Sequence, residues 1–168
     1  MKDEKINNGS SGFTLVELLV VMTILGILAT VGLGSFRSSQ EKSRDARRKS
    51  DLAAIQKGLE MYQNDHVAYP ASDSSGQIVV PSVGSLPWKN EDGSKTSFQD
   101  SKETIYIKEL PNDPMGHPNY CYYFDSAGKY YKLYARLENA NDPAVKGPYT
   151  CGAVANYNFG VSSSNINL

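Results

Sequence analysis

The chain has 168 residues, of which 40% are hydrophobic, and its 17 Lys and Arg against 18 Asp and Glu leave a formal net charge of -1. This length allows one domain, or a small domain with an appendage. The near-neutral charge excludes a strongly basic body that would bind nucleic acid over its whole surface. The densest hydrophobic sequence lies in the first quarter, whereas residues 65–168 are rich in Ser, Asn, Gly, Pro and Tyr. Those residues are enough for one modest core.

A polar leader, residues 1–12, precedes an apolar stretch, residues 13–36, in which Glu17 is the only charged side chain. As an α-helix this stretch would be about 36 Å long, which exceeds the roughly 30 Å hydrocarbon core of a bilayer. A secretory signal peptide has a shorter apolar run and a small-residue cleavage site, and no A-x-A pattern follows Phe36. The sequence therefore predicts a transmembrane helix over residues 13–36.

The helical pattern continues beyond Phe36 as an amphipathic segment, residues 37–64. Its apolar residues recur at spacings of three, four and three, which places them on one stripe of a helix: Leu52, Ile55, Leu59 and Tyr62. No proline interrupts the chain between Phe13 and Tyr69, so both parts can form one continuous helix. Asn64-Asp65 and then Tyr69-Pro70 predict its end.

Residues 65–168 read as a small β-rich head. Residues 120–125 and 129–137 flank Ser126-Ala127-Gly128. In the second run the side chains alternate, with one face made by Tyr131, Leu133, Ala135 and Leu137, which predicts an antiparallel hairpin. Further strands are expected in 77–80 and 104–110, and loops rich in Pro, Asn and Asp in 110–119 and 138–148. The expected fold class is α+β, with a long N-terminal helix packed on a small, mostly antiparallel sheet.

Cys121 and Cys151 both lie beyond the predicted span, where an oxidising exterior would let them pair. A disulfide there would stabilise the head by roughly 3 to 4 kcal/mol in the chain-entropy description. Two buried free thiols are the alternative.

The stretch "GFTLVELLVVMTILGIL" resembles the N-terminus of the type IV pilin and pseudopilin family, whose precursors carry a class III signal peptide. The resemblance implies that a prepilin peptidase cuts between Gly12 and Phe13 and methylates the new amine of Phe13. It also implies polymerisation with other pilin subunits, driven by an assembly platform and its ATPase machinery. The subunit would span the inner or cytoplasmic membrane once and later join an extracellular surface filament.

Glu17 falls on the family's glutamate, one helical turn past the new terminus. A carboxylate at mid-membrane costs about 2.5 to 3.5 kcal/mol on insertion scales, so it calls for a partner. The amine of Phe13, on the same or on a neighbouring subunit, would supply one and would favour an axial stagger between subunits. Alternatively, Thr14 and Glu17 form a [ST]-x-x-[DE] capping box, which explains the carboxylate by helix capping alone.

A basic run follows the span and is diluted by only three acidic residues; its members are Arg37, Lys42, Arg44, Arg47, Arg48 and Lys49. The positive-inside rule would place this run in the cytoplasm. The peptidase that the resemblance implies and the two cysteines place it outside instead. A solvated or inter-subunit helix face is the favoured interpretation, and contact with DNA is a weaker one.

Little in the head points to catalysis. His66 and His117 are the only histidines, and no catalytic triad or zinc motif accompanies them, so neither an enzyme nor a cofactor is expected. The segment "LPNDPMGHPNY" resembles a loop in the heads of major pseudopilins, some of which bind calcium. Asp113, Asp125 and Asp142 are weak candidate ligands, and turn formation is the favoured role of these aspartates.

The expected function is that of a structural subunit of a type IV pilus-like surface filament, polymerised through its N-terminal helix after leader cleavage. A pseudopilin of a type II secretion or competence DNA-uptake machine is the alternative within the same family. An enzyme or binding domain that is merely anchored by one span is a more distant alternative.

Overall fold

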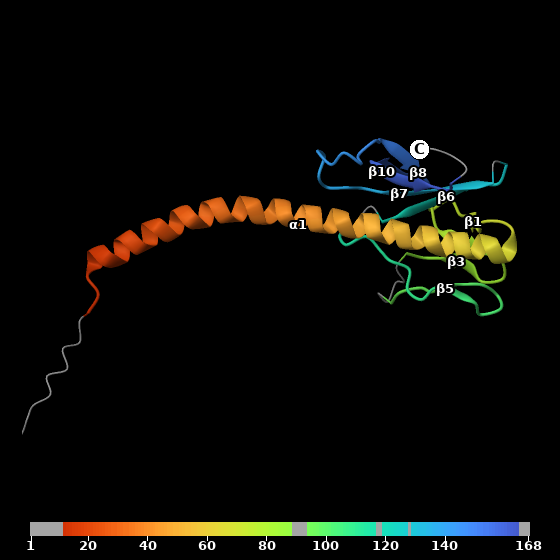
Figure 1. The fold of residues 1–168 in the computed structure, drawn as a ribbon, viewed down its shortest axis with the longest axis horizontal. Helices are drawn as coiled ribbons and strands as arrows, with labels where there is room; N and C mark the ends of the chain where they lie inside the picture. The colour runs from red at the N-terminus through yellow and green to blue at the C-terminus, as the bar shows by residue number, and fades with distance from the viewer. Residues whose placement is uncertain (1–11, 89–93, 117–118, 128, 165–168) are drawn as a thin grey trace, which may run out of the picture. The chain divides into compact units, whose positions relative to one another are not determined.

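The structure, a computed structural model, describes residues 12–88, 94–116, 119–127 and 129–164, with the backbone alone for residues 31–34. It contains one helix of 52 residues, α1 (Leu15–His66), followed by ten short strands (Figure 1). The chain divides into two compact units, residues 1–39 and 40–168. The second unit contains the C-terminal part of α1 and all the strands of the described residues, so it begins before residue 65, where the sequence places the start of the β-rich head.

The helix ends slightly later than expected. The sequence places its end at Asn64-Asp65, whereas α1 continues through His66. The amide of Val67 still donates a hydrogen bond to the carbonyl oxygen of Gln63, at 2.8 Å. Val67 then adopts a left-handed conformation with φ of 63°, which turns the chain out of the helix before Pro70 is reached.

The strands of the described residues form small antiparallel sheets. The first sheet has the order β1-β2-β3, and the central one β10-β7-β6; β4 pairs with β5, and β8 with β9. The strands are β1 (Ala71–Ser72), β2 (Ile78–Val80), β3 (Gly84–Leu86), β4 (Phe98–Gln99), β5 (Ile105–Ile107), β6 (Cys121–Asp125), β7 (Tyr130–Ala135), β8 (Tyr149–Cys151), β9 (Val154–Tyr157) and β10 (Phe159–Ser162). The α+β class with a mostly antiparallel head is therefore confirmed.

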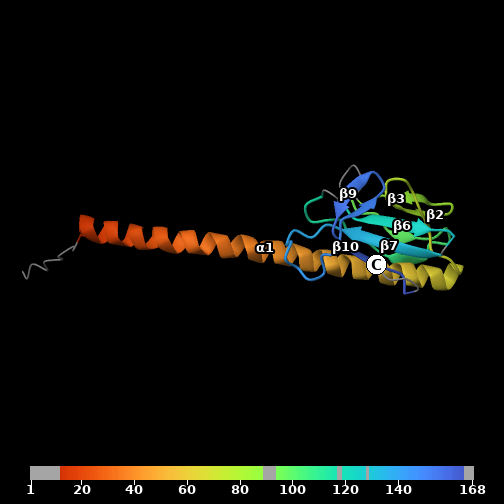
Figure 2. The ribbon, with the colours of Figure 1, turned by 90° about the horizontal axis from the view of Figure 1, so that it is seen from above.

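The core of the head lies between α1 and the sheets. The predicted stripe of α1 is buried along its whole length, with Leu52, Ile55 and Leu59 at 0% exposure. Figure 2 shows β7 and β10 running beside this part of the helix. Leu52, Ile55 and Leu59 share one cluster with Tyr122 of β6 and Leu133 of β7. Burying such side chains is the main stabilising contribution to the head, at about 1.5 to 3 kcal/mol for each.

The hairpin of β6 and β7 has the register that its alternation requires. Tyr122 faces Leu133 across the pair and both point into the core, whereas Tyr123 faces Lys132 on the outer side. The hydroxyl of the buried Tyr122 donates to the carbonyl oxygen of Pro70 at 2.6 Å, which satisfies its only polar group. One-residue slippage would bring Tyr123 and Lys132 into the core, so burial of one face fixes the pairing.

Candidate assembly site

The N-terminal half of α1 leaves its apolar side chains in contact with solvent. Leu15, Leu18, Ile24 and Leu28 are each more than half exposed. This part of the helix is long and apolar enough to cross a membrane by length and composition. An apolar surface of this size requires a bilayer or other apolar helices around it. It therefore suggests a single-pass anchor, as the sequence predicted for residues 13–36.

Glu17 lies at the very start of α1 and forms the capping box with Thr14. The amide and the hydroxyl of Thr14 donate to Oε2 of Glu17 at 2.9 and 2.8 Å, and the amide of Glu17 donates to Oγ1 of Thr14 at 3.2 Å. The two hydrogen bonds that Thr14 donates reach the same oxygen of the Glu17 carboxylate, and no hydrogen bond from the described residues reaches Oε1. Helix capping is thus one role that this chain realises, and it leaves half of the carboxylate available.

Gly12 and Phe13 precede the helix and are exposed. A Cβ atom at Gly12 would have no atom within 4 Å, so the fold itself has no need of glycine at this position. No hydrogen bond joins Phe13 to Glu17 in the part of the chain that the structure describes. Of the expected leader, residues 1–11 lie outside the described residues.

The basic run has a role that the sequence did not predict, because three of its six residues bind loops of the same chain. Arg48 is 2% exposed and donates to Asp113 through Nε at 2.6 Å and Nη2 at 3.1 Å. Its Nη1 donates to Asp45 at 2.8 Å and to Glu138 at 2.6 Å. Burial disfavours the charged guanidinium, but these three carboxylates outweigh that effect and raise the pKa of Arg48. One buried side chain of α1 thus holds the two loops that contain Asp113 and Glu138.

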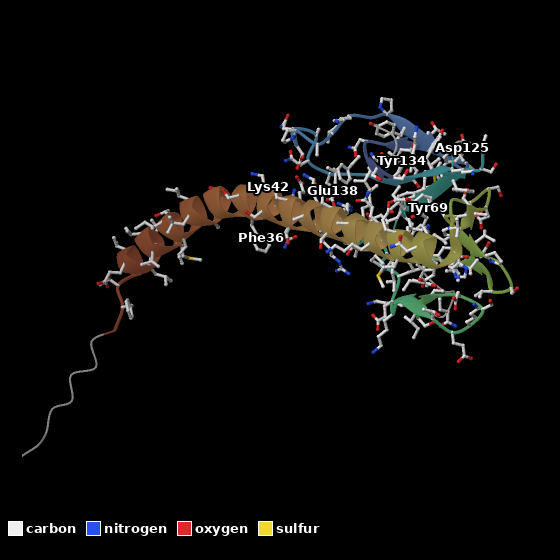
Figure 3. All side chains as sticks on the ribbon, turned by 45° about the vertical axis from the view of Figure 1, so that its right-hand side comes forward. Phe36, Lys42, Tyr69, Asp125, Tyr134 and Glu138 are labelled. Carbon is white, nitrogen blue, oxygen red and sulfur yellow. A yellow bond between two sulfur atoms is a disulfide. The ribbon has the colours of Figure 1, made fainter. Side chains whose placement is uncertain are left out.

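Two further basic residues support the second of these loops. Arg44 donates through Nε to Glu138 at 2.8 Å, and this hydrogen bond lowers the pKa of Glu138 to about 2. Lys49 reaches both carboxylate oxygens of Asp142 at 2.7 Å. Figure 3 shows Glu138 beside α1, close to the turn of the helix that carries Lys42. These pairs engage the charges of Arg44, Arg48 and Lys49 within the chain, so only the other three residues of the basic run are exposed: Arg37, Lys42 and Arg47.

The sequence offered one signal for this arrangement. Asp45 and Arg48 are spaced as neighbours on a helix face, and both are buried. The carboxylate of Asp45 also accepts the amides of Glu138 and Asn139, each at 2.9 Å. What the sequence could not show is that this face of α1 meets the loop 138–148, because that contact spans 93 residues of chain.

The three weak candidate metal ligands are not brought together. Asp113 binds Arg48, and Asp142 binds Lys49. Asp125 lies at the far end of the β6–β7 hairpin, where its carboxylate accepts the amide of Ala127 at 2.8 Å (Figure 3). The described part of the chain contains no group of three or more His, Cys, Asp or Glu side chains that could hold a metal ion. Turn formation and ion pairing account for these aspartates in the structure.

Cys121 and Cys151, the pair expected to be bridged, form a disulfide in the structure. It joins β6 in the central sheet to β8 and so fastens the β8–β9 hairpin. Tyr134 packs next to this bridge, with its ring 5.2 Å from that of Tyr149 and 6.1 Å from that of Tyr157. His66 has a structural role, since its Nε2 lies 3.1 Å from Oδ2 of Asp100. His117 lies outside the described residues.

Comparison with known proteins gives two family matches that together cover most of the chain. Residues 7–33 match the prokaryotic N-terminal methylation motif, and residues 36–143 match type II secretion system (T2SS), protein G. The first match contains Gly12, Phe13 and Glu17, and the second contains Arg48, Asp113 and Glu138.

Similar curated proteins carry the same description. The type II secretion system core protein G of Aeromonas hydrophila is 34% identical over 125 residues, which are 73% of this chain and 78% of that protein. The corresponding core protein G of Pseudomonas aeruginosa is 36% identical over 112 residues, 64% of this chain and 70% of the relative. The comparison with solved structures found no match. The chain therefore belongs to the type II secretion system protein G family, a pseudopilin branch of the type IV pilin-like proteins.

Proposed function

We propose that this chain is a pseudopilin of a type II secretion apparatus, the alternative to a surface pilus that its sequence allows. The observation that carries the proposal is the family match over residues 36–143, joined directly to the methylation motif over residues 7–33. The relatives are described as core proteins of a secretion system, so the chain is a structural subunit and not an enzyme. A filament confined to the cell envelope replaces the surface filament as its expected product.

The proposed life of the subunit has two stages. Residues 1–12 are a leader that a prepilin peptidase removes, residues 13–36 anchor the subunit in the inner membrane, and residues 37–64 continue the helix into the head of residues 65–168. On polymerisation the exposed apolar side chains of α1 leave lipid and pack against those of other copies. The assembly platform and its ATPase are the partners that this step requires.

In this proposal Glu17 joins subunits through its free oxygen. Capping occupies Oε2, and Oε1 is available for the amine that cleavage creates at Phe13 of a neighbouring copy. A charge pair at low dielectric favours the axial position that brings the two groups together. Capping and pairing then coexist, instead of being exclusive explanations of the carboxylate.

The substitution Glu17→Gln tests the proposal, because it keeps the shape and much of the capping capacity but removes the charge. We expect the variant chain to insert, to be cleaved and to fold, but to lose cross-linkable polymer and secretion of an exported protein by at least tenfold. Glu41→Gln, a charge removal on the same helix, is the matched control and should keep both. Normal polymers built only from the Glu17→Gln chain would return Glu17 to capping alone. Abundant sheared surface filaments would favour the pilus instead.

A further inference from the structure

An open groove of about 650 Å³ runs along α1 on the side of β10. Its helical wall contains Ala53, Lys57 and Met61, and Ser162 at the end of β10 lines the opposite wall. The side-chain amide of Gln56 donates to the carbonyl oxygen of Ser162 at 3.0 Å, which holds β10 at this distance from the helix. Met61 is 52% exposed, so the groove presents an apolar surface that this chain leaves uncovered in the described residues.

The groove also presents a positive charge. Glu60 lines it too, but its two carboxylate oxygens accept the hydroxyls of Tyr69 and Tyr131 at 2.9 and 3.0 Å. Lys57 is exposed and has no hydrogen bond or ion pair to any other residue that the structure describes. A partner for this groove should therefore offer an apolar side chain next to a carboxylate.

The turn between β4 and β5 offers that combination. Glu103 in the turn and Ile105, the first residue of β5, are both exposed, Ile105 to 55%. Within residues 12–88, 94–116, 119–127 and 129–164 the carboxylate of Glu103 has no partner. Glu103 has φ of 65°, a left-handed conformation that is unfavourable for a residue with a Cβ atom. The backbone turn accounts for this conformation, because the amide of Glu103 donates to the carbonyl oxygen of Asp100 at 3.1 Å, and the turn leaves the charged side chain exposed.

This turn is held firmly by the rest of the head. The carboxylate of Asp100 accepts the amides of Lys102 and Thr104 at 2.9 and 2.8 Å. Its other oxygen lies 3.1 Å from Nε2 of His66 and accepts the hydroxyl of Tyr106 at 3.3 Å. The exposed residues are therefore presented from a fixed support at the end of α1, which reduces the entropy lost when they bind.

The turn and the groove lie on different sides of α1. Figure 1 shows β5 on one side of the helix and β10 on the other. Gly58 faces Ile107 of β5, whereas Gln56 faces β10. A contact between the turn and the groove therefore joins two copies through two different surfaces. Such a heterologous contact leaves one turn and one groove free at the ends, and it gives an open polymer wherever the rotation between copies does not close into a ring.

We propose that the β4–β5 turn of one copy docks into the α1–β10 groove of the next copy. Ile105 covers Met61 and Ala53 of that copy, and Glu103 pairs with Lys57. This contact deepens the proposed function and rests on it, since it names the partner of the head within the polymer. The apolar contact contributes affinity, and the ion pair at its rim sets which surfaces meet.

Charge reversal in the full-length, membrane-inserted chain tests the contact. Glu103→Lys and Lys57→Glu should each lower the amount of cross-linkable polymer at least tenfold, and the chain with both substitutions should regain most of it. Glu109→Lys is the matched control, because Glu109 is exposed beside the same hairpin and pairs only with the exposed Lys95 at 2.6 Å among the described residues. Failure of the double variant to recover would overturn the proposal.

Disulfide trapping supplies an independent readout. A chain with Glu103→Cys, produced together with a chain with Lys57→Cys, should give a dimer that neither chain gives alone. A chain ending at Ser164 should trap equally well. If trapping appears only in that shortened chain, the groove belongs to the chain's own end and the proposal is wrong.

The two proposals fail in different ways. If the natural chain polymerises, depends on Glu17 and yet tolerates Glu103→Lys without trapping, only the docking of the turn is refuted. If the natural chain gives no polymer in its own envelope, the pseudopilin function itself is refuted.

Discussion

At the scale of single residues, Arg48 is the side chain that organises the base of the head. Its guanidinium is buried and meets Asp45, Asp113 and Glu138. Buried ion pairs contribute little net stability relative to apolar replacements of the whole set, because every charge loses its hydration. Removing one member is costly, since the others stay buried without a partner. The network therefore mainly fixes the positions of two loops on α1. As a complete set it adds little to the free energy of unfolding.

Arg48→Met should destabilise the head by about 3 to 5 kcal/mol, because it leaves the buried Asp45 and Asp113 without their cation. Arg44→Met is the control: Arg44 and Glu138 have side chains that are 28% and 27% exposed, and this pair is worth less than about 1 kcal/mol. Urea unfolding of the full chain in detergent, followed by near-ultraviolet circular dichroism, measures both. Equal losses in the two variants would contradict the role given to Arg48.

Glu138 gives the head a dependence on acid. Its pKa is lowered from 4.5 to about 2, first by the hydrogen bond from Arg44, so its contribution to stability is complete above pH 4.5. As the pH falls toward 2, the unfolded chain binds a proton that the folded chain does not, and stability is lost. The free energy of unfolding should fall more steeply between pH 4.5 and 2 in the natural chain than in Glu138→Gln. Parallel curves for the two chains would rule this out.

At the scale of elements, the strongly patterned segments were the predictable ones. Residues 129–137 alternate and residues 120–125 are rich in aromatic side chains, and these two runs contain β7 and β6 in the structure. The strand β10 was missed, because "NFGVSSS" has small polar residues and one glycine where a strand signal would have apolar ones. In the structure it pairs with β7, with Val161 opposite the buried Leu133. This pairing is a tertiary effect that no local pattern contains.

The same distinction applies to the candidate site. The exposed apolar half of α1 and the capping box are local features, and the sequence shows both. The pairing of the basic run with Asp113, Glu138 and Asp142 is not local, and a run of charges reads as a solvated face until the loops are placed. The groove between α1 and β10 could not be expected either, since it depends on the unpredicted β10.

Gly58 allows the β4–β5 hairpin to approach the helix. A Cβ atom at this position would lie 2.5 Å from Cγ1 and 2.6 Å from Cδ1 of Ile107. Alanine would favour the helix by up to about 1 kcal/mol, but overpacking costs about 1 to 3 kcal/mol. Gly58→Ala should therefore destabilise the head, by up to about 2 kcal/mol. In the background of Ile107→Ala the same substitution should be neutral or stabilising. Unfolding free energies of the four chains measure this, and additive effects would contradict the close contact.

The disulfide is the covalent link between elements. Cys121 and Cys151 are 30 residues apart, and cross-linking them stabilises the head by about 3 to 4 kcal/mol in the chain-entropy description. Replacing both with Ser should lower the unfolding free energy by that amount and increase hydrogen exchange in β8 and β9 first. Peptide mapping without reduction should recover the bridged pair from the natural chain. Two thiols open to alkylation in native protein would refute the link.

At the scale of the whole molecule, the two compact units differ in how much apolar surface they leave exposed. The head buries its apolar stripe and pairs its buried charges, and no buried side-chain nitrogen or oxygen of the described residues lacks a hydrogen-bond partner. By contrast, the large apolar side chains in the N-terminal half of α1 are exposed. An apolar surface of this size requires lipid or other apolar helices around it. The position of this apolar surface is what the proposed sequence of membrane insertion and later polymerisation rests on.

Leader removal between Gly12 and Phe13 is the change that would turn the membrane-bound chain into an assembly-competent one. A side chain at Gly12 would meet nothing within 4 Å, so Gly12→Leu leaves the fold intact, and any loss of processing reports on the peptidase. Gly26→Leu is the matched control, because Gly26 also has open space around it. We expect intact mass spectrometry to find a chain beginning at methylated Phe13 in the natural protein and in the control, but the full precursor in Gly12→Leu. A mature natural chain that retains residues 1–12, or one trimmed after Phe36, would contradict both the leader and the polymer that depends on its removal.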